Sequence, residues 1–230
     1  MGKRKNKLSK EEQAEVEEWI YQNNTEETRM TDTMTIRVKC KTENQKLLVN
    51  AIKDKEVIIC SGPAGTGKTF LACAEALKLI KRNGKYKKIV IVKSVTTLKN
   101  EEIGFLKGNL REKMEPFMFS FVHNFEKIVG QSITSRLREL KTIEELPIAY
   151  MRGINLDRSI IIIDEAQNIS QENMRTILTR LGKDSKMIFL GDERQQDSKG
   201  GNGLTFLMEN FKDIEEIGCV QFNKSDVVRN

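Results

Sequence analysis

The eight residues GPAGTGKT, at positions 62–69, have the types and spacing of a loop that binds phosphate. They fit the pattern G-x-x-x-x-G-K-[ST] between an apolar run and a helical pattern, where backbone N–H groups and a helix N-terminus can face a polyanion. Lys68 can reach the β and γ phosphates of ATP, and the Thr69 hydroxyl can bind Mg²⁺. The alternative is a glycine-rich turn that arose by chance, but such a turn would not require all the residues of the G-x-x-x-x-G-K-[ST] pattern. We therefore expect ATP contacts along the whole loop, from Gly62, Pro63, Ala64, Gly65, Thr66, Gly67, Lys68 and Thr69.

Two adjacent acids follow the four isoleucines of IIIIDEAQN, residues 160–168. The carboxyl ends of parallel strands open onto a ligand crevice, so Asp164 should lie beside the phosphates and hold Mg²⁺ through water. Glu165 can then orient and polarise a water molecule for attack on the γ phosphate. The alternative for Glu165 is a solvated side chain at a strand end. We interpret the two acids as the metal-binding and the catalytic carboxylate of ATP hydrolysis.

Two glutamines are further candidates. Gln195 lies in GDERQQD, after another apolar run, where a polar side chain can sense the γ phosphate or the attacking water. Gln45 lies 17 positions before Gly62, where an adenine-reading glutamine occurs in several helicase families. An ordinary residue on a helix surface is the alternative for Gln45.

Efficient transfer of the γ phosphate usually needs a cationic finger in addition to the loop lysine. The candidates are Arg152 in AYMRG, Arg180 in TILTRLG and Arg229 in DVVRN. We favour Arg229 acting within its own chain and Arg152 or Arg180 acting across an interface, because a ring with one nucleotide at each interface would supply the finger from a neighbour. Each arginine is equally compatible with an ordinary ion pair.

The elements that must position these residues form an alternating pattern of strands and helices. Continuous β-branched runs separated by helical patterns predict an α/β fold with a doubly wound, mostly parallel sheet of about five strands. The expected strands are 57–61, 88–94, 160–164, 187–191 and 214–220, and the expected helices are 42–53, 68–83, most of 100–146, and 171–181. We treat residues 1–41 as an N-terminal extension with a helix over 9–23 and a short strand over 35–39, and residues 42–230 as the ATPase domain.

Composition limits the possible functions. The 230 residues carry a formal net charge of +6, which is compatible with a polyanionic partner without demonstrating one. His123 is the single histidine, which excludes a histidine triad or a multi-histidine metal site. The four cysteines form no CxxC pair, so we expect a reducing, cytoplasmic location, and no apolar run approaches the roughly 20 residues that cross a membrane.

Several stretches together resemble the PhoH family of cytoplasmic ATPases. They are TENQKLLVNAI, SGPAGTGKT, EEIGFLKGNLREKMEPF, LPIAYMRGINL, IIIIDEAQNISQENMRTILTRLG, GDERQQD and DVVR, which cover most of the chain from Glu43 onward. The resemblance implies an ATP-binding, RecA-like core similar to the ATPase half of superfamily 1 helicases, assembly into rings, and a link with phosphate starvation or RNA metabolism. The sequence departs from the family where Lys107 replaces the usual proline and Asn230 the usual histidine after DVVR.

Three functions are therefore considered. The first is a ring-forming ATPase, hexameric if it follows the family, that acts on single-stranded RNA or DNA. The second is a nucleotide-controlled protein-interaction module whose slow ATP hydrolysis ignores nucleic acid. The third, a ribonuclease, is disfavoured because residues 1–41 are too short and lack a suitable acidic cluster.

Overall fold

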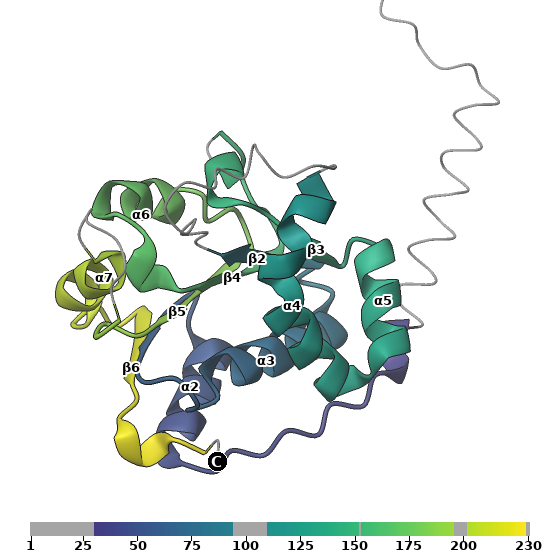
Figure 1. Ribbon diagram of the computed structural model, residues 1–230, viewed down its shortest axis with the longest axis horizontal. Coiled ribbons are helices and arrows are strands. Elements are labelled where there is room, and N and C mark those ends of the chain that lie inside the picture. Colours follow the sequence, from purple (N-terminus) through teal and green to yellow (C-terminus); the bar gives the residue numbers. More distant parts are fainter. Residues whose placement is uncertain (1–29, 94–109, 152, 196–201, 229–230) are drawn as a thin grey trace, which may run out of the picture.

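The computed structural model describes residues 30–93, 110–151, 153–195 and 202–228 of the chain (Figure 1). Its centre is a six-stranded sheet in which every pairing is parallel and the strand order is β3-β2-β4-β5-β1-β6. The strands are β1 Val57–Ser61, β2 Lys88–Lys93, β3 Ile143–Glu145, β4 Ser159–Asp164, β5 Lys186–Gly191 and β6 Ile217–Gln221. The predicted α/β fold with a parallel sheet is confirmed.

Helices cover both faces of this sheet (Figure 1). One face packs against α2 Glu43–Asp54, α3 Lys68–Asn83, α4 Leu110–Val129 and α5 Gln131–Glu139. The other face packs against α6 Gln171–Leu178 and α7 Gly203–Phe211, together with the short 3₁₀ helices η2 Ile148–Met151 and η3 Ala166–Asn168. A third 3₁₀ helix, η4 Lys224–Asp226, follows β6.

The isoleucine run of β4 shows why the central strands are so apolar. Ile160 and Ile162 belong to the hydrophobic core under α2–α5, whereas Ile161 and Ile163 belong to the core under α6 and α7. Successive side chains of a strand point to opposite faces, so a strand covered on both sides needs apolar residues at every position. The run ends where the sheet ends, and Asp164 is the first side chain that is not fully buried.

The structure corrects two predictions of strands. The sheet has six strands rather than about five because β3, three residues long, lies in the stretch predicted to be mostly helical. In that stretch α4 ends at Val129, Gly130 takes φ +88°, and α5 follows before the chain turns into β3 at the edge of the sheet. The strand predicted over 35–39 is wrong: this segment belongs to no strand of the described residues, and Ile36 and Val38 pack on the core.

Smaller differences concern element ends and the N-terminal region. Helix α6 ends at Leu178 rather than 181, and β6 begins at Ile217 rather than 214. The helix predicted over 9–23 lies outside the described residues. The boundary predicted at residue 41 remains a prediction, although Met34 and Cys40 before it already contact the core under α2–α5.

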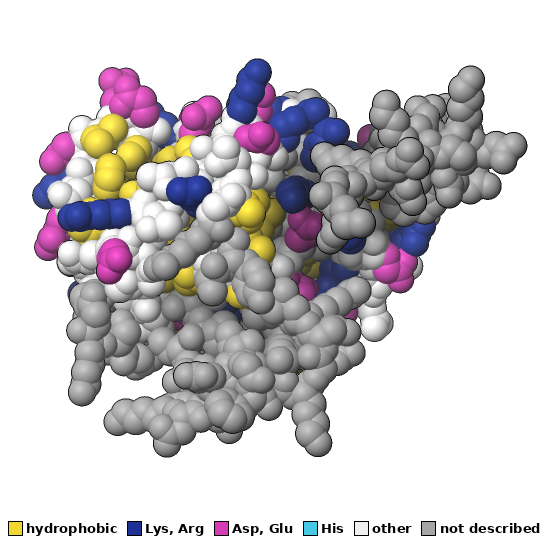
Figure 2. Space-filling view, turned by 90° about the horizontal axis from the view of Figure 1, so that it is seen from above, with side chains coloured by type: hydrophobic (Ala, Val, Ile, Leu, Met, Phe, Trp, Pro, Cys, Tyr) yellow, Lys and Arg dark blue, Asp and Glu magenta, His cyan; other side chains and the backbone are white. Residues whose placement is uncertain are grey.

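The outer surface carries charges of both signs. On the face seen in Figure 2, basic and acidic side chains of the described residues are interspersed and surround a group of hydrophobic side chains. All four cysteines, Cys40, Cys60, Cys73 and Cys219, are free thiols. Among the described residues no helix is long and apolar enough to cross a membrane.

Candidate nucleotide-binding site

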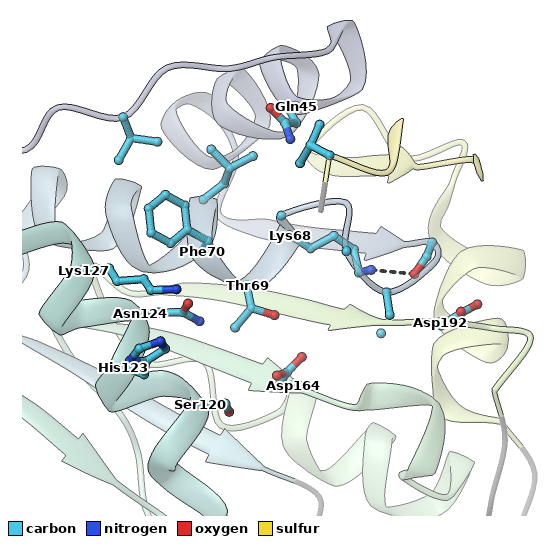
Figure 3. Close-up of a pocket in the computed structure, with 18 of the residues that line it drawn as sticks. Gln45, Lys68, Thr69, Phe70, Ser120, His123, Asn124, Lys127, Asp164 and Asp192 are labelled. Carbon is cyan, nitrogen blue, oxygen red and sulfur yellow. Dashed lines mark hydrogen bonds between the residues drawn. The ribbon is translucent and has the colours of Figure 1, made fainter. Parts of the chain in front are cut away.

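The carboxyl ends of β1, β4 and β5 meet at one edge of the sheet. Ser61 lies beside Gly191 in the β1–β5 pairing, and the Gly62 N–H donates to the Gly191 carbonyl at 3.0 Å. A cavity of about 780 Å³ opens at this edge (Figure 3). Its walls include residues of the phosphate loop, the ends of β4 and β5, α4, and the segments before α2 and after β6. The topology thus brings together motifs that are more than a hundred positions apart in the sequence.

The phosphate loop, residues 62–69, leads directly into α3. Gly67 is the N-cap of α3 and has φ +84°, a left-handed conformation that side-chain-bearing residues rarely adopt. The Lys68 ammonium donates to the carbonyls of Gly62, at 2.5 Å, and Pro63, at 2.8 Å, within the loop. Burial lowers the pKa of Lys68 from its usual value, an effect that nearby Asp164 opposes. A phosphate entering the loop would replace these carbonyls as the partner of a desolvated lysine.

The outer side of the loop is held by two distant segments. The Gln45 side chain, 3% exposed, donates through Nε2 to the Thr66 carbonyl at 2.9 Å and accepts the Lys41 N–H at 2.6 Å. The Val228 N–H donates to the Gly65 carbonyl at 3.0 Å. Because these two carbonyls accept hydrogen bonds on the outer side of the loop, the loop N–H groups remain available for a ligand. One N–H and one lone pair of the Gln45 amide remain beyond these two bonds, so its contact with adenine stays a prediction.

Asp164 and Thr69 face the same part of the cavity (Figure 3). Burial, and then the neighbouring Glu165 carboxylate, raise the pKa of Asp164 to about 6. The ammonium groups of Lys93 and Lys68 oppose this shift. A carboxylate and a hydroxyl next to a phosphate loop are oxygen donors of the kind that Mg²⁺ prefers, and the metal would complete its shell with water and nucleotide oxygens. The oxygen donors of Asp164 and Thr69 therefore fit a magnesium ion bound together with a nucleotide.

Glu165 lines the cavity one residue after Asp164. Its backbone is left-handed, with φ 55° and ψ 39°, an uncommon conformation for a residue other than glycine. This turn ends β4 abruptly and begins η3, so that Glu165 leaves the strand at the rim of the cavity. Its carboxylate accepts a hydrogen bond from Gln167 Nε2 at 2.6 Å. The sequence did not assign Gln167 a role, because its burial and its hydrogen-bond partners become apparent only in the folded structure.

Gln195 also lines the cavity, after the end of β5. Its N–H donates to the Asp192 carbonyl at 3.0 Å, which closes a turn over Glu193 and Arg194. The structure thus places Lys68, Thr69, Asp164 and Glu165 in one cavity with Gln195, as their spacing suggested.

The arginines are placed differently. Arg180 follows α6, and its carbonyl accepts the Leu156 N–H ahead of β4, at the amino end of the sheet and therefore away from the phosphate loop. Its guanidinium donates to the Thr176 carbonyl and the Thr179 hydroxyl. Arg180 thus does not reach the cavity of its own chain. Arg152 and Arg229 lie outside the described residues.

A wall of α4 was not anticipated from the sequence. Ser120, His123, Asn124 and Lys127 line the cavity opposite the phosphate loop (Figure 3). They follow helical spacing, while Phe121 and Phe125 on the other side of α4 are buried. Amphipathic spacing shows which side of a helix is buried, but it does not show what the polar side faces.

Comparison with known proteins identifies the family. The profile of the family described as PhoH-like protein matches residues 37–230. A PhoH-like protein of Bacillus subtilis is 39% identical over 226 residues, which cover 97% of this chain and 69% of the relative. The protein PhoH of Escherichia coli is 34% identical over 200 residues, 85% of this chain and 56% of the relative. The chain therefore spans about half to two thirds of the length of these relatives.

Solved structures with similar folds are more distant. The helicase domain of Hef from Pyrococcus furiosus aligns over 80% of this chain and 38% of its own, with 16% identity and a TM-score of 0.46. The large terminase of a thermophilic bacteriophage, solved in complex with ADP, aligns over 79% of this chain and 44% of its own, with 11% identity and a TM-score of 0.42. The family profile extends over the sheet, the phosphate loop, Asp164 and Glu165, so the chain belongs to the PhoH-like protein family.

Proposed function

We propose that this protein is a Mg²⁺-dependent ATPase that forms a homo-oligomeric ring and acts on single-stranded RNA or DNA. The observation that carries the ATPase part is the shared cavity of Lys68, Thr69, Asp164 and Glu165. A lysine and a loop of N–H groups would hold the phosphates, and the metal held by Thr69 and Asp164 would neutralise the developing charge. Glu165 would orient the attacking water, and Gln195 would respond to the γ phosphate.

The test of ATP hydrolysis is steady-state phosphate release by wild type and Glu165→Gln. General-base catalysis contributes about 10²- to 10⁴-fold, so Glu165→Gln should lower kcat at least about 100-fold while ATP still binds. Glu172→Gln changes an exposed acid on neighbouring α6 and serves as the matched control with wild-type turnover. Hydrolysis by Glu165→Gln at the wild-type rate would refute the assignment.

The ring is proposed because no arginine among the described residues lines the cavity, and a neighbouring subunit could supply one. Arg180 lies near the amino ends of the strands, away from the phosphate loop, so it would meet a nucleotide only in a neighbouring subunit. Arg152 remains the other candidate for a finger across the interface, and Arg229, directly after the Val228 contact with the loop, the candidate within the chain. Light scattering with and without ATP measures the subunit number, and a monomer under both conditions would exclude the ring.

Action on a single strand rests on the family and on the helicase-like branch of the fold. The basic stretch 81–88 gives it little support, because Lys81 donates to the Asp32 and Met34 carbonyls and Lys88 pairs with Glu144. Poly-uridylate RNA or single-stranded DNA should raise wild-type turnover, and added salt should reduce that effect. Turnover that ignores both polymers would remove this part of the proposal.

A nucleotide-controlled interaction module is the second candidate, and the Val228 contact favours it. The segment after β6 is bonded to the phosphate loop itself, so loop rearrangement on ATP binding would shift the C-terminal segment. Slow hydrolysis without any response to nucleic acid is the result that distinguishes this candidate.

For either function we propose a reducing compartment, the cytoplasm, in keeping with the four free thiols.

A further inference from the structure

Gln167 joins the ends of two neighbouring strands. The residue is 2% exposed and belongs to η3, directly after β4. Its Nε2 donates to Glu165 Oε2 at 2.6 Å, and its Oε1 accepts the Asp192 N–H, at the end of β5, at 3.1 Å. One amide therefore connects the candidate catalytic carboxylate to the turn that carries Gln195.

The surroundings of Gln167 leave this amide little freedom. A Cβ atom at Gly191 would collide with Gln167 Oε1, so the end of β5 approaches the amide closely because residue 191 is glycine. Glu165 itself has a left-handed backbone, which persists only where surrounding contacts hold it. The bond to an ionised carboxylate is of the charge-assisted kind, which is about twice as strong as a neutral one.

The contact has a chemical consequence for Glu165. A carboxylate has two oxygens, and the bond to Gln167 uses Oε2, so Oε1 can accept a proton from an attacking water. A general base must be within hydrogen-bond reach of its proton, and a displacement of about 1 Å can reduce a rate about 100-fold. Fixing one oxygen of Glu165 fixes the place of the other.

We infer that Gln167 is a positioning residue, which sets the Glu165 carboxylate for water activation and links its place to the turn of Asp192 and Gln195. This inference rests on the proposed ATPase function. The link runs from Glu165 through the Gln167 amide to the Asp192 N–H, and from the Asp192 carbonyl to the Gln195 N–H. A shift of the β5 end in response to the γ phosphate would move Glu165 with it.

Two substitutions separate the two ends of the amide. Gln167→Met keeps the length of the side chain and removes both hydrogen bonds. Gln167→Glu keeps an oxygen for the Asp192 N–H but faces Glu165 with a second carboxylate oxygen instead of a donor. Gln171→Met, at an exposed position at the start of α6, is the matched control.

The kcat, the Kd for ADP and the thermal unfolding are measured for each variant. Single-turnover rates of ATP hydrolysis are measured for each substitution alone and combined with Glu165→Gln. Loss of one charge-assisted bond should lower kcat about 10- to 150-fold in both Gln167 variants, with the Kd for ADP within about twofold of wild type. In the Glu165→Gln background the same substitutions should change the residual rate by less than about twofold, because their effect acts through Glu165.

Each other outcome decides against the inference. Wild-type kcat in Gln167→Met, or in Gln167→Glu alone, would show that Glu165 needs no positioning by this amide. An equal loss in both backgrounds, or weak ADP binding with early unfolding, would make Gln167 a structural residue. Absence of any Glu165-dependent turnover in the wild type is a different result, which refutes the proposed function and this inference with it.

Discussion

Replacing Asp164 with asparagine should stabilise the ligand-free protein while removing the proposed metal-dependent ATPase activity. Burial raises the pKa of Asp164 from 3.8 to about 6, so the folded state disfavours the carboxylate relative to the unfolded state. Above pH 6 the carboxylate is ionised and this penalty is fully present. It is relieved as the pH falls from 6 towards 3.8, because the folded state then binds a proton that the unfolded state does not.

The magnitude follows from the shift. A difference of about 2 pKa units, at 1.36 kcal/mol each, is about 3 kcal/mol, and this is an upper limit because Asp164 keeps some contact with water. A neutral isostere should therefore raise the free energy of unfolding by about 1–3 kcal/mol at pH 7.5. For a domain of this size the gain corresponds to about 2–10 °C in Tm.

The assay is urea unfolding of wild type and Asp164→Asn at pH 7.5, 6 and 4.5, without nucleotide or metal. The difference should be largest at pH 7.5 and should shrink towards pH 4.5, whereas Mg²⁺ with ATP should stabilise the wild type alone. Asp213→Asn, at an exposed acid after α7, controls for loss of surface charge. A destabilised Asp164→Asn at pH 7.5, or a difference that does not vary with pH, would refute the reasoning.

Two further predictions concern residues other than Asp164 and Glu165. Lys186 is 2% exposed at the start of β5, and burial, together with Lys85, lowers its pKa to about 8. Its positive charge therefore destabilises the folded state below pH 8, and this effect decreases between pH 8 and 10.5. Lys186→Met should raise the free energy of unfolding at pH 7, by an amount that shrinks at pH 9.5 in urea unfolding; an unchanged difference would contradict this. Val228→Pro removes the N–H that donates to the Gly65 carbonyl, and loss of about 1 kcal/mol should weaken ATP binding about fivefold in a calorimetric titration. Unchanged affinity would mean that the segment after β6 does not support the loop.

The parts of the fold that the sequence predicts well are those encoded in short stretches. The loop over 62–69 and the start of α3 follow from one local pattern, and the isoleucines of β4 identify a strand without reference to anything else in the chain. β3 was missed because its IEE stretch carries no apolar run, and it becomes a strand through pairing with β2. The segment over 35–39 has the alternation of a strand, but its apolar residues pack on the core without a partner strand.

The same distinction applies to the candidate site. Lys68, Thr69, Asp164 and Glu165 belong to motifs whose spacing is local, so their meeting could be expected from a parallel sheet. The contact of Gln167 with Asp192, the α4 wall and the Val228 bond depend on how separate elements pack. No pattern within a dozen residues contains that information.

The strand order has a consequence for synthesis of the chain. β1 pairs with β5 and β6, which come much later in the sequence, so its hydrogen-bonding edges stay unsatisfied until β5 and β6 have also been translated. Such non-local pairing slows folding and exposes apolar edges in the nascent chain. The phosphate loop, bonded to Gly191 and Val228, is complete only after these later segments have been added and have packed. ATP in the surrounding solution would therefore act as a selective ligand for finished molecules, drawing the slow last step of folding towards completion.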